Sequence, residues 1–460
     1  MKKNRYFILL VLVNFMILGV QAQGRKMTID EVDSLAALHN LQLKTLQLEV
    51  DAAEGQLAQA RKYENPEVQL MHNIQNPLNR RWFDVGYDGQ TDIQISQPIA
   101  IGGQYKNKVK QARASLNATR AGYQAEKMNV RREARTAFID LYNAQQKLKV
   151  YDKEIASVEK IHKAFDEQAA KGNVSKMETF RIAAMLNQLR GEKMELMMQE
   201  NNIQKDLRLL LNLKDETGME AGMEAGMKAE MKAGMKAGIE AGIEAEMDEN
   251  AAICGVAELL AKMQAELLAK MQAKKFPAQS SELSSLLQNH PEMIQAKYLE
   301  ESAQHAIRVE KSEALPRISL NGEWDKNGSI GHNFFAVGAT VSLPLWNRNQ
   351  GNIRSAKAQY AQAAIERQQR ENELQASFRL HYQATLQNLN LVEEQKKQLS
   401  ADIGQLLSAA EEQFLKRNIS VIEFVDLYSS YRDTQFMLQD AKAQLLKSCE
   451  ELKKYAGFVK

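Results

Sequence analysis

The 460-residue sequence is poor in cysteine, proline and tryptophan, with two, seven and three residues of these types. The two cysteines, Cys254 and Cys449, are too few for a disulfide framework, and a single bond between them is the less favoured alternative. Neither sign of charge dominates, because 60 basic residues face 58 acidic ones and leave a formal net charge of +2. This balance argues against nucleic acid as a partner.

Motifs that would mark an enzyme are also missing. The sequence has no His-Glu-x-x-His zinc motif, no Cys-x-x-Cys pair, no phosphate-binding loop and no Gly-x-Ser-x-Gly turn. Its seven histidines are scattered, so we interpret each as a surface or packing residue. The sequence therefore predicts a protein that is not an enzyme and has neither a cofactor nor a metal site.

Long apolar runs are confined to the N-terminus. A basic start at residues 2–5 precedes an apolar stretch at 6–20, and the small residue Ala22 follows. This order predicts a secretory signal peptide over residues 1–22, with an uncleaved anchor as the less favoured alternative. No later run reaches the roughly 18 apolar residues of a spanning helix, so an exported chain of this kind is either periplasmic or a β-barrel.

The rest of the chain is built from two copies of one unit, which we place at residues 23–213 and 281–460. Similar segments recur in the same order about 245–250 residues apart, and the best match pairs residues 167–175 with residues 412–420. Chance explains several ordered matches poorly, so we expect both units to share one fold.

Each unit is predicted to contain a helix, two strands, a very long helix, a tight turn and a returning helix. The first helices are expected at residues 28–63 and 281–314, and each stops before a proline. Proline-free segments at 104–171 and 350–416 predict the long helices, each on the order of 100 Å in length. The returning helices are shorter, so we expect each to stack end to end with the first helix of its unit.

Four short segments alternate between apolar and polar residues, which predicts β-strands. They lie at residues 68–70, 93–95, 318–324 and 335–343. All three tryptophans, Trp82, Trp324 and Trp346, lie in or beside these segments. Interfacial aromatics are typical of membrane barrels, whereas a soluble sheet with one buried face is the alternative.

Four strands cannot close a barrel, and open sheet edges are not tolerated in lipid. Three chains would supply 12 strands, an even number within the usual range. We therefore expect a trimer that shares one barrel, with the helices of the three chains around a tunnel.

Residues 214–280 depart from the repeated plan, because they consist largely of Met-, Ala-, Gly- and Glu-rich blocks. Thioethers suit Cu(I), but a loose repeat does not supply the geometry of a metal site. We interpret the segment as a low-complexity insert near the middle of the tunnel.

The duplicated plan resembles the TolC-like outer-membrane factors of tripartite efflux pumps and type I secretion systems. The resemblance rests on the repeated unit, on the two turns, and on Gln97-Pro98 with Gly102-Gly103, while residues 341–351 look like the cobalt-zinc-cadmium, heavy-metal branch. It implies a mainly α fold with a membrane β-barrel, located in the outer membrane with a large periplasmic portion. It also implies a homotrimer, contact with outer-membrane lipid, a periplasmic adaptor protein and an inner-membrane proton-driven pump as partners.

The candidate functional residues lie at and just beyond the two turns. The resemblance assigns a pore constriction at the closed periplasmic entrance to Glu178, Glu423 and Asp426, and solvated surface charges are the alternative. The turns are predicted to contact the adaptor through Lys171, Gly172, Asn173, Val174, Ser175, Lys416, Arg417, Asn418, Ile419 and Ser420.

These observations predict a passive conduit for heavy-metal cations in a tripartite efflux pump. A duct for drug efflux or type I protein secretion is one alternative, because a fold alone does not identify what is transported. A periplasmic coiled-coil scaffold without a pore is an alternative of another class.

Overall fold

The computed structural model describes residues 25–76, 79–213, 219–221, 287–328, 331–398 and 403–456. The expected signal peptide, nearly all of the Met-rich insert, and Cys254 lie outside the described residues, so the predictions for them stay predictions. The chain divides into two compact units. The hairpin unit comprises residues 1–44, 126–283 and 375–460, and the sheet unit comprises residues 45–125 and 284–374. Each compact unit therefore takes segments from both sequence repeats.

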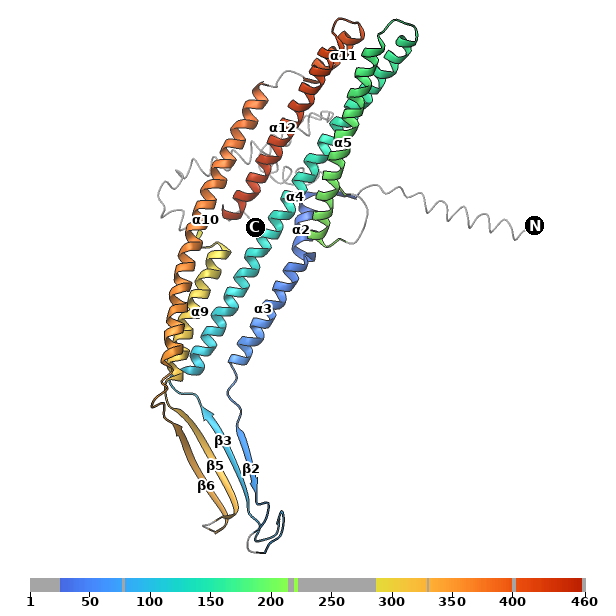
Figure 1. The fold of residues 1–460 in the computed structure, drawn as a ribbon. Helices are drawn as coiled ribbons and strands as arrows, with labels where there is room; N and C mark the ends of the chain where they lie inside the picture. Colours follow the sequence, from blue (N-terminus) through green and yellow to red (C-terminus); the bar gives the residue numbers. More distant parts are fainter. Residues whose placement is uncertain are drawn as a thin grey trace, which may run out of the picture. The chain divides into compact units, whose positions relative to one another are not determined.

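The sheet unit contains a four-stranded antiparallel sheet to which both repeats contribute two strands (Figure 1). In spatial order the strands are β2 (Glu67–His72), β3 (Thr91–Ile99), β5 (Arg317–Gly328) and β6 (Gly331–Ser342). The four predicted strands are confirmed, and β2 and β6 are the edges of this sheet.

The first long helix is confirmed as α4 (Gln104–Ala170), a single helix of 67 residues. It follows Gly102 and Gly103, whose φ angles of +65° and +77° lie in the left-handed region that glycine enters without steric cost. A Cβ at Gly102 would also lie 2.0 Å from the side chain of Leu315. The chain therefore needs glycine to turn from sheet into helix at this point.

The second long helix is described as α10 (Gln350–Gln398) and α11 (Ile403–Leu415), and residues 399–402 lie outside the described part. The returning helices α5 (Lys176–Leu211) and α12 (Val421–Ala456) each have 36 residues. None of the helices that the structure describes is long and apolar enough to cross a membrane.

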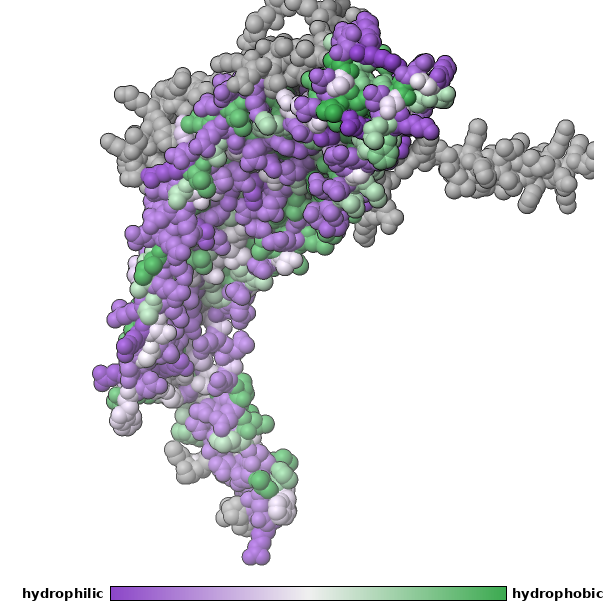
Figure 2. All heavy atoms as spheres, turned by 45° about the horizontal axis from the view of Figure 1, so that its top comes forward, coloured by the Kyte–Doolittle hydropathy of each residue, from purple (hydrophilic) through white to green (hydrophobic). Residues whose placement is uncertain are grey.

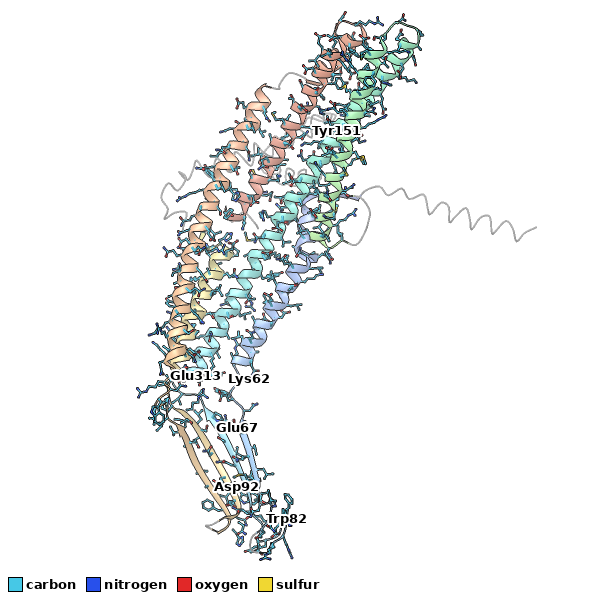
Figure 3. The ribbon with its side chains drawn as sticks, in the orientation of Figure 1. Lys62, Glu67, Trp82, Asp92, Tyr151 and Glu313 are labelled. Carbon is cyan, nitrogen blue, oxygen red and sulfur yellow. The ribbon has the colours of Figure 1, made fainter. Side chains whose placement is uncertain are left out.

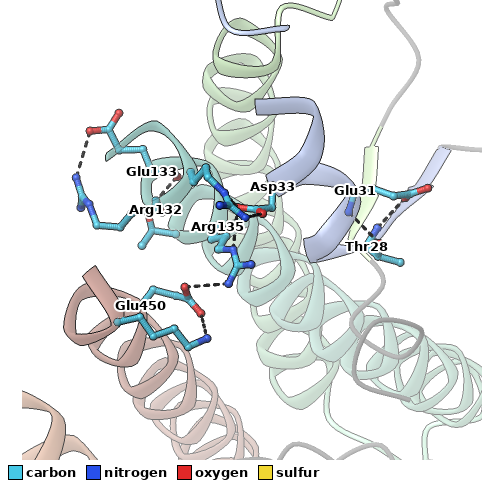
Figure 4. Close-up of polar contacts among 10 residues, drawn as sticks. Thr28, Glu31, Asp33, Arg132, Glu133, Arg135 and Glu450 are labelled. Carbon is cyan, nitrogen blue, oxygen red and sulfur yellow. Dashed lines mark hydrogen bonds and ion pairs between the residues drawn. The ribbon is translucent and has the colours of Figure 1, made fainter. Parts of the chain in front are cut away.

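The predicted helix at residues 28–63 is two helices, α2 (Ile29–His39) and α3 (Leu41–Ala60). A capping box starts α2: Thr28 Oγ1 accepts the Glu31 N–H at 3.2 Å, and the Glu31 carboxylate accepts the Thr28 N–H at 3.0 Å (Figure 4).

Just before α2, the strand β1 (Arg25–Met27) pairs in parallel with β4 (Met219–Ala221). In the second repeat the first helix is α9 (Pro291–Glu313), which begins after its N-cap His290.

Asn40 joins two helices through one buried side chain. Its Oδ1 accepts the N–H of Leu43 in the first turn of α3 at 3.1 Å, and its Nδ2 donates to the Leu210 carbonyl at the end of α5 at 2.9 Å. One amide thus satisfies a donor at the start of one helix and an acceptor at the end of another, groups that helices leave unpaired. In the first repeat, the end of α5 therefore meets the start of α3, whereas α2 contacts α5, so the end-to-end stacking predicted for the whole first helix applies to α3 alone.

The hairpin unit is held by an apolar core and by buried ion pairs. The core residues are Tyr151, Val158, Ile161, Ile182, Leu186, Leu189, Phe414, Val421, Phe424 and Tyr428, drawn from α4, α5, α11 and α12. In α2, the buried Asp33 carboxylate accepts from Arg131 Nε at 2.8 Å and Arg135 Nε at 3.1 Å, and Arg135 also pairs with Glu450 at 3.3 Å (Figure 4). Burial alone would raise the pKa of Asp33, but the hydrogen bond from Arg131 and the charges of Arg135 and Arg131 outweigh it and lower that pKa.

The double cap at Asn40 predicts a measurable loss of stability when its side chain is removed. Asn40→Ala should lower the free energy of unfolding by about 1–3 kcal/mol, because it removes a cap and leaves the carbonyl of the half-buried Leu210 without that donor. Thermal unfolding followed by circular dichroism measures the change. Gln56→Ala, at an exposed position of α3, is the control. Equal melting temperatures for the two variants would show that Asn40 does not hold the junction.

Candidate functional site

The strand register gives the sheet one apolar and one polar face. Val68 lies opposite Ile95, and Trp324 lies opposite Phe335. Because successive side chains alternate between faces, the register defines every other member of each face. The apolar face also carries Leu70, Ile93, Ile99, Ile318, Leu320, Val337, Ala339 and Val341. The opposite face is mainly polar and carries Gln69, Asp92, Gln94, Ser96, Asn321, Glu323, Asp325, Thr340 and Ser342, together with the apolar Met71, Pro98, Phe334 and Ala336.

The apolar face is exposed rather than buried, with Val337 at 93% and Phe335 at 74% exposure. Figure 2 shows hydrophobic side chains on the surface of the sheet, at the lower end of the view. β5 and β6 have 12 residues each and β3 has nine, and a strand needs about 9–11 to cross a bilayer. An apolar outer face and a polar inner face are the pattern of a membrane barrel, so the chemistry of this sheet fits lipid on one side and water on the other.

The three tryptophans occupy different levels of the sheet unit. Trp324 is on the apolar face in β5, and Trp346 follows the end of β6 and is 88% exposed. Trp82 lies in the loop between β2 and β3 at the end of the sheet opposite Lys62 and Glu313 (Figure 3). Aromatic residues at both ends of an apolar band are what barrels show at the two lipid–water interfaces.

The two predicted turns, both in the hairpin unit, have the same backbone arrangement. The N–H of Asn173 donates to the Gln168 carbonyl, and the N–H of Asn418 donates to the Gln413 carbonyl, both at 2.9 Å. Each asparagine side chain also donates to the side chain of the same glutamine, at 2.9 Å in the first turn and 2.6 Å in the second. The recurrence of Gln and Asn in the two repeats thus follows from the geometry of the turn, a helix end closed in the left-handed region.

Arg417 connects the two turns. It occupies the position of Gly172 and takes a φ of +61°, a conformation that costs a non-glycine residue about 1–2 kcal/mol. Its guanidinium donates to the carbonyl oxygen of Asn173 at 2.7 Å. This hydrogen bond offsets the backbone cost and places the two turns side by side.

The remaining turn residues divide by exposure. Lys171, Ser175, Lys416 and Ser420 are exposed, and Val174 is half-buried. Ile419 is also half-buried, because it packs against the core of the hairpin unit. The structure therefore brings the predicted adaptor-contact residues to two adjacent turns, whereas contact with an adaptor stays a prediction.

The three predicted constriction carboxylates have different surroundings. Glu423 forms a capping box with Ser420, whose N–H it accepts at 2.7 Å, and this backbone hydrogen bond lowers the pKa of Glu423. Asp426 is exposed one turn further along α12. Glu178 is half-buried, and in its turn the Ser175 hydroxyl accepts from the N–H of Met177. A ring of these carboxylates needs several copies of the chain and stays a prediction.

Among the described residues, no group of three or more metal-binding side chains occurs.

Glu154 is a buried acidic residue that sequence reasoning missed. It is 3% exposed, and neither carboxylate oxygen has a hydrogen-bond partner among the described residues. Burial raises its pKa to about 7; the charge of Arg432 opposes this shift, and Glu192 and Asp433 add to it. Glu154 lies three residues after Tyr151 and four before Val158, on the apolar face of α4. This helical spacing predicts that its side chain is buried.

A family model of outer membrane efflux proteins matches residues 33–213 and 283–458. The chain belongs to the outer membrane efflux protein family. It is accordingly an outer-membrane efflux channel with a large periplasmic portion, and the TolC-like resemblance is confirmed. The cobalt-zinc-cadmium resistance protein CzcC of Cupriavidus metallidurans is 22% identical over 74% of this chain and 68% of its own.

Solved structures share the fold at low sequence identity. A membrane protein from Pseudomonas aeruginosa superimposes with a TM-score of 0.69 at 15% identity, covering 93% of this chain and 90% of that one. The CmeC outer membrane channel of Campylobacter jejuni has a TM-score of 0.67 at 16% identity, covering 93% and 85%. These similarities show that the chain has the fold of these solved structures.

The buried Glu154 predicts a pH-dependent stability of the hairpin unit. Its pKa is higher in the folded than in the unfolded chain, so the folded state favours the proton and stability falls as pH rises from about 4.5 through 7. Glu154→Gln should remove about 3 kcal/mol of this loss at pH 8 and leave stability at pH 4 nearly unchanged. Chemical unfolding at both pH values measures the effect. The exposed Glu195→Gln is the control, and an equal pH dependence in wild type and Glu154→Gln would contradict the assignment.

Proposed function

We propose that three copies of the chain share one barrel and form the outer-membrane duct of a tripartite pump that exports heavy-metal cations. The observation that carries the proposal is the sheet with an exposed apolar face and two open edges, β2 and β6. Unpaired backbone N–H and C=O groups at such edges cost several kcal/mol each in lipid. Pairing β6 of one copy with β2 of the next satisfies them, and three copies of a four-stranded sheet give 12 strands.

Two features support a cation as cargo. The polar face of the sheet carries Asp92, Glu323 and Asp325, and rings of Asp or Glu favour cations in channels. The similar protein CzcC is named for cobalt, zinc and cadmium resistance. Drug efflux or type I protein secretion is the second candidate, because the fold is shared by channels of different cargo. A periplasmic scaffold without a pore is disfavoured, because the apolar face of the sheet would then be exposed to water.

The remaining partners follow from the same proposal. The adjacent turns around Gly172 and Arg417 contact a periplasmic adaptor, and a proton-driven pump in the inner membrane supplies the energy. Threefold symmetry turns Glu178, Glu423 and Asp426 into rings of negative charge at the periplasmic entrance. Such rings would deter anions and retain cations.

The constriction is tested by Glu423→Gln combined with Asp426→Asn. Glutamine keeps a capping box with Ser420, so the variant removes charge without removing the helix start. We expect trimers by native mass spectrometry, and in planar bilayers a cation selectivity reduced at least threefold at low salt, where screening is weakest. Glu195→Gln with Asp206→Asn, at exposed positions of α5, is the control.

The two results bear on different claims. A monomer without conductance would contradict the shared barrel. A conducting trimer with wild-type selectivity and wild-type block by divalent cations would place these carboxylates away from the pore.

The adaptor contact is tested by introducing charge at the first turn. Val174→Arg, or Lys171→Glu as a second variant, should lower cobalt tolerance at least tenfold in cells that carry the complete pump, because a charge at the docking surface opposes the partner. Trimers should persist. Met194→Arg, at an exposed apolar position of α5 away from the turn, is the matched control and should keep tolerance. Full tolerance in both turn variants would show that this turn does not dock the adaptor.

A further inference from the structure

The described part of the loop between β2 and β3, residues 73–76 and 79–90, has a polar interior. Asn76 is 1% and Asp84 is 6% exposed. The Asp84 carboxylate accepts from Asn76 Nδ2 at 2.9 Å, from Asn79 Nδ2 at 2.6 Å and from the N–H of Gly86 at 3.0 Å. Buried carboxylates need such partners, so Asp84 is the centre around which the loop is folded.

The outside of the same loop carries large apolar side chains among exposed polar ones. Its large exposed hydrophobic residues are Ile74, Trp82, Phe83, Val85 and Tyr87. A loop in water normally turns its apolar side chains inward, whereas this loop buries Asn76 and Asp84 and exposes these five. The arrangement suits a surface that faces lipid or another apolar partner.

The backbone holds this reversed arrangement against its local preference. Arg80 and Phe83 take φ angles of 57° and 47°, which non-glycine residues rarely adopt. The N–H of Arg80 donates to the Asn76 carbonyl and the N–H of Phe83 to the Ile74 carbonyl, both at 2.8 Å. Lys326 Nζ in β5 also donates to the carbonyls of residues 85 and 86, both at 2.7 Å. The loop is therefore tied to the sheet with Trp82 and Phe83 directed outward.

Two cations adjoin the exposed aromatic residues. Arg80 and Arg81 are exposed, and the charge of Arg81 contributes to lowering the pKa of Asp84. Asp84 is occupied inside the loop, which leaves Asp88 as its exposed carboxylate. Guanidinium groups bind phosphate with a planar fork of donors, and aromatic side chains concentrate at the headgroup level of membranes.

We propose that this loop binds the phosphate groups of anionic lipid headgroups in the outer leaflet. Arg80 and Arg81 contact the phosphates, while Trp82 and Phe83 enter the apolar layer beneath. The loop is at the end of the sheet away from the helices, and the large periplasmic portion is helical, so this end faces the outer leaflet (Figure 3). The inference rests on the shared barrel proposed above, because the barrel places the sheet upright in the bilayer.

The test measures energy transfer from Trp82 to labelled lipid in vesicles that contain the full-length protein. Trp324→Phe with Trp346→Phe leaves Trp82 as the donor. Vesicles of phosphatidylcholine contain either a labelled bisphosphorylated glycolipid or the same glycolipid without phosphate. Arg80→Asn with Arg81→Gln removes both charges, and asparagine tolerates the left-handed backbone at residue 80. Lys44→Gln with Arg379→Gln removes the same charge at exposed helix positions and is the control.

We expect the phosphorylated lipid to be enriched around Trp82 both in the protein with Trp82 as its single tryptophan and in the control variant made in the same background. The loop variant should lose about 5-fold for each arginine, the equivalent of about 1 kcal/mol per basic residue near an anionic surface. If the double variant does not assemble, Arg81→Gln alone, at an ordinary backbone position, should lose about 5-fold.

Two outcomes would overturn the proposal. Equal enrichment of both lipids would show that phosphate is not recognised. Enrichment unchanged by the loop variant would place the recognition elsewhere. Conductance of the same samples reports on the shared barrel separately, so a loss of conductance in wild type would count against the pore and not against the loop.

Discussion

The backbone N–H and C=O groups at the two edges of the sheet need hydrogen-bond partners, and this requirement constrains how the protein can be placed in a membrane. Each repeat supplies two strands, and the pairing of β3 with β5 joins them into one sheet. The outer strands β2 and β6 still have one unpaired side each. In lipid those groups require partners, and the barrel proposed above supplies them from the edges of identical chains. In such a barrel the polar face of the sheet would line a water-filled interior.

The helices meet a different requirement, that of staying ordered in water with a narrow apolar core. Caps and ion pairs do much of this: Asn40 serves two helices at once, and Asp33 is held by two arginines. Each of the two turns is likewise closed by a few polar contacts, because one Gln–Asn side-chain pair bridges it. Glu154 is the exception, a carboxylate buried without a hydrogen-bond partner in the described structure, and its raised pKa makes the core sensitive to pH.

Much of this architecture is visible in the sequence because its signals are local and repeated. The alternation around Phe335, the proline-free segment from Gln104 and the paired turns at Asn173 and Asn418 all predicted the elements that the structure contains. The break at Asn40 is absent from the elements expected from the sequence, although asparagine is a favoured N-cap and Asn40 caps α3 through Leu43. Its second partner, the Leu210 carbonyl, lies 170 positions away in the chain and is found only in the tertiary structure. Arg417 is predicted from the sequence as an adaptor-contact residue, and its alignment with Gly172 also indicates the left-handed backbone that the structure contains.

The sequence by itself determined the classes of element, their order, the duplication and the membership of the outer membrane efflux protein family, because periodicity and turn chemistry act over a few residues. Only the tertiary structure decided how strands far apart in the chain align into one continuous apolar face. It also decided that Asp84 would be buried while Trp82 is exposed. Register and burial depend on contacts between distant segments, and a shift of one residue in the register would send every side chain of a strand to the other face.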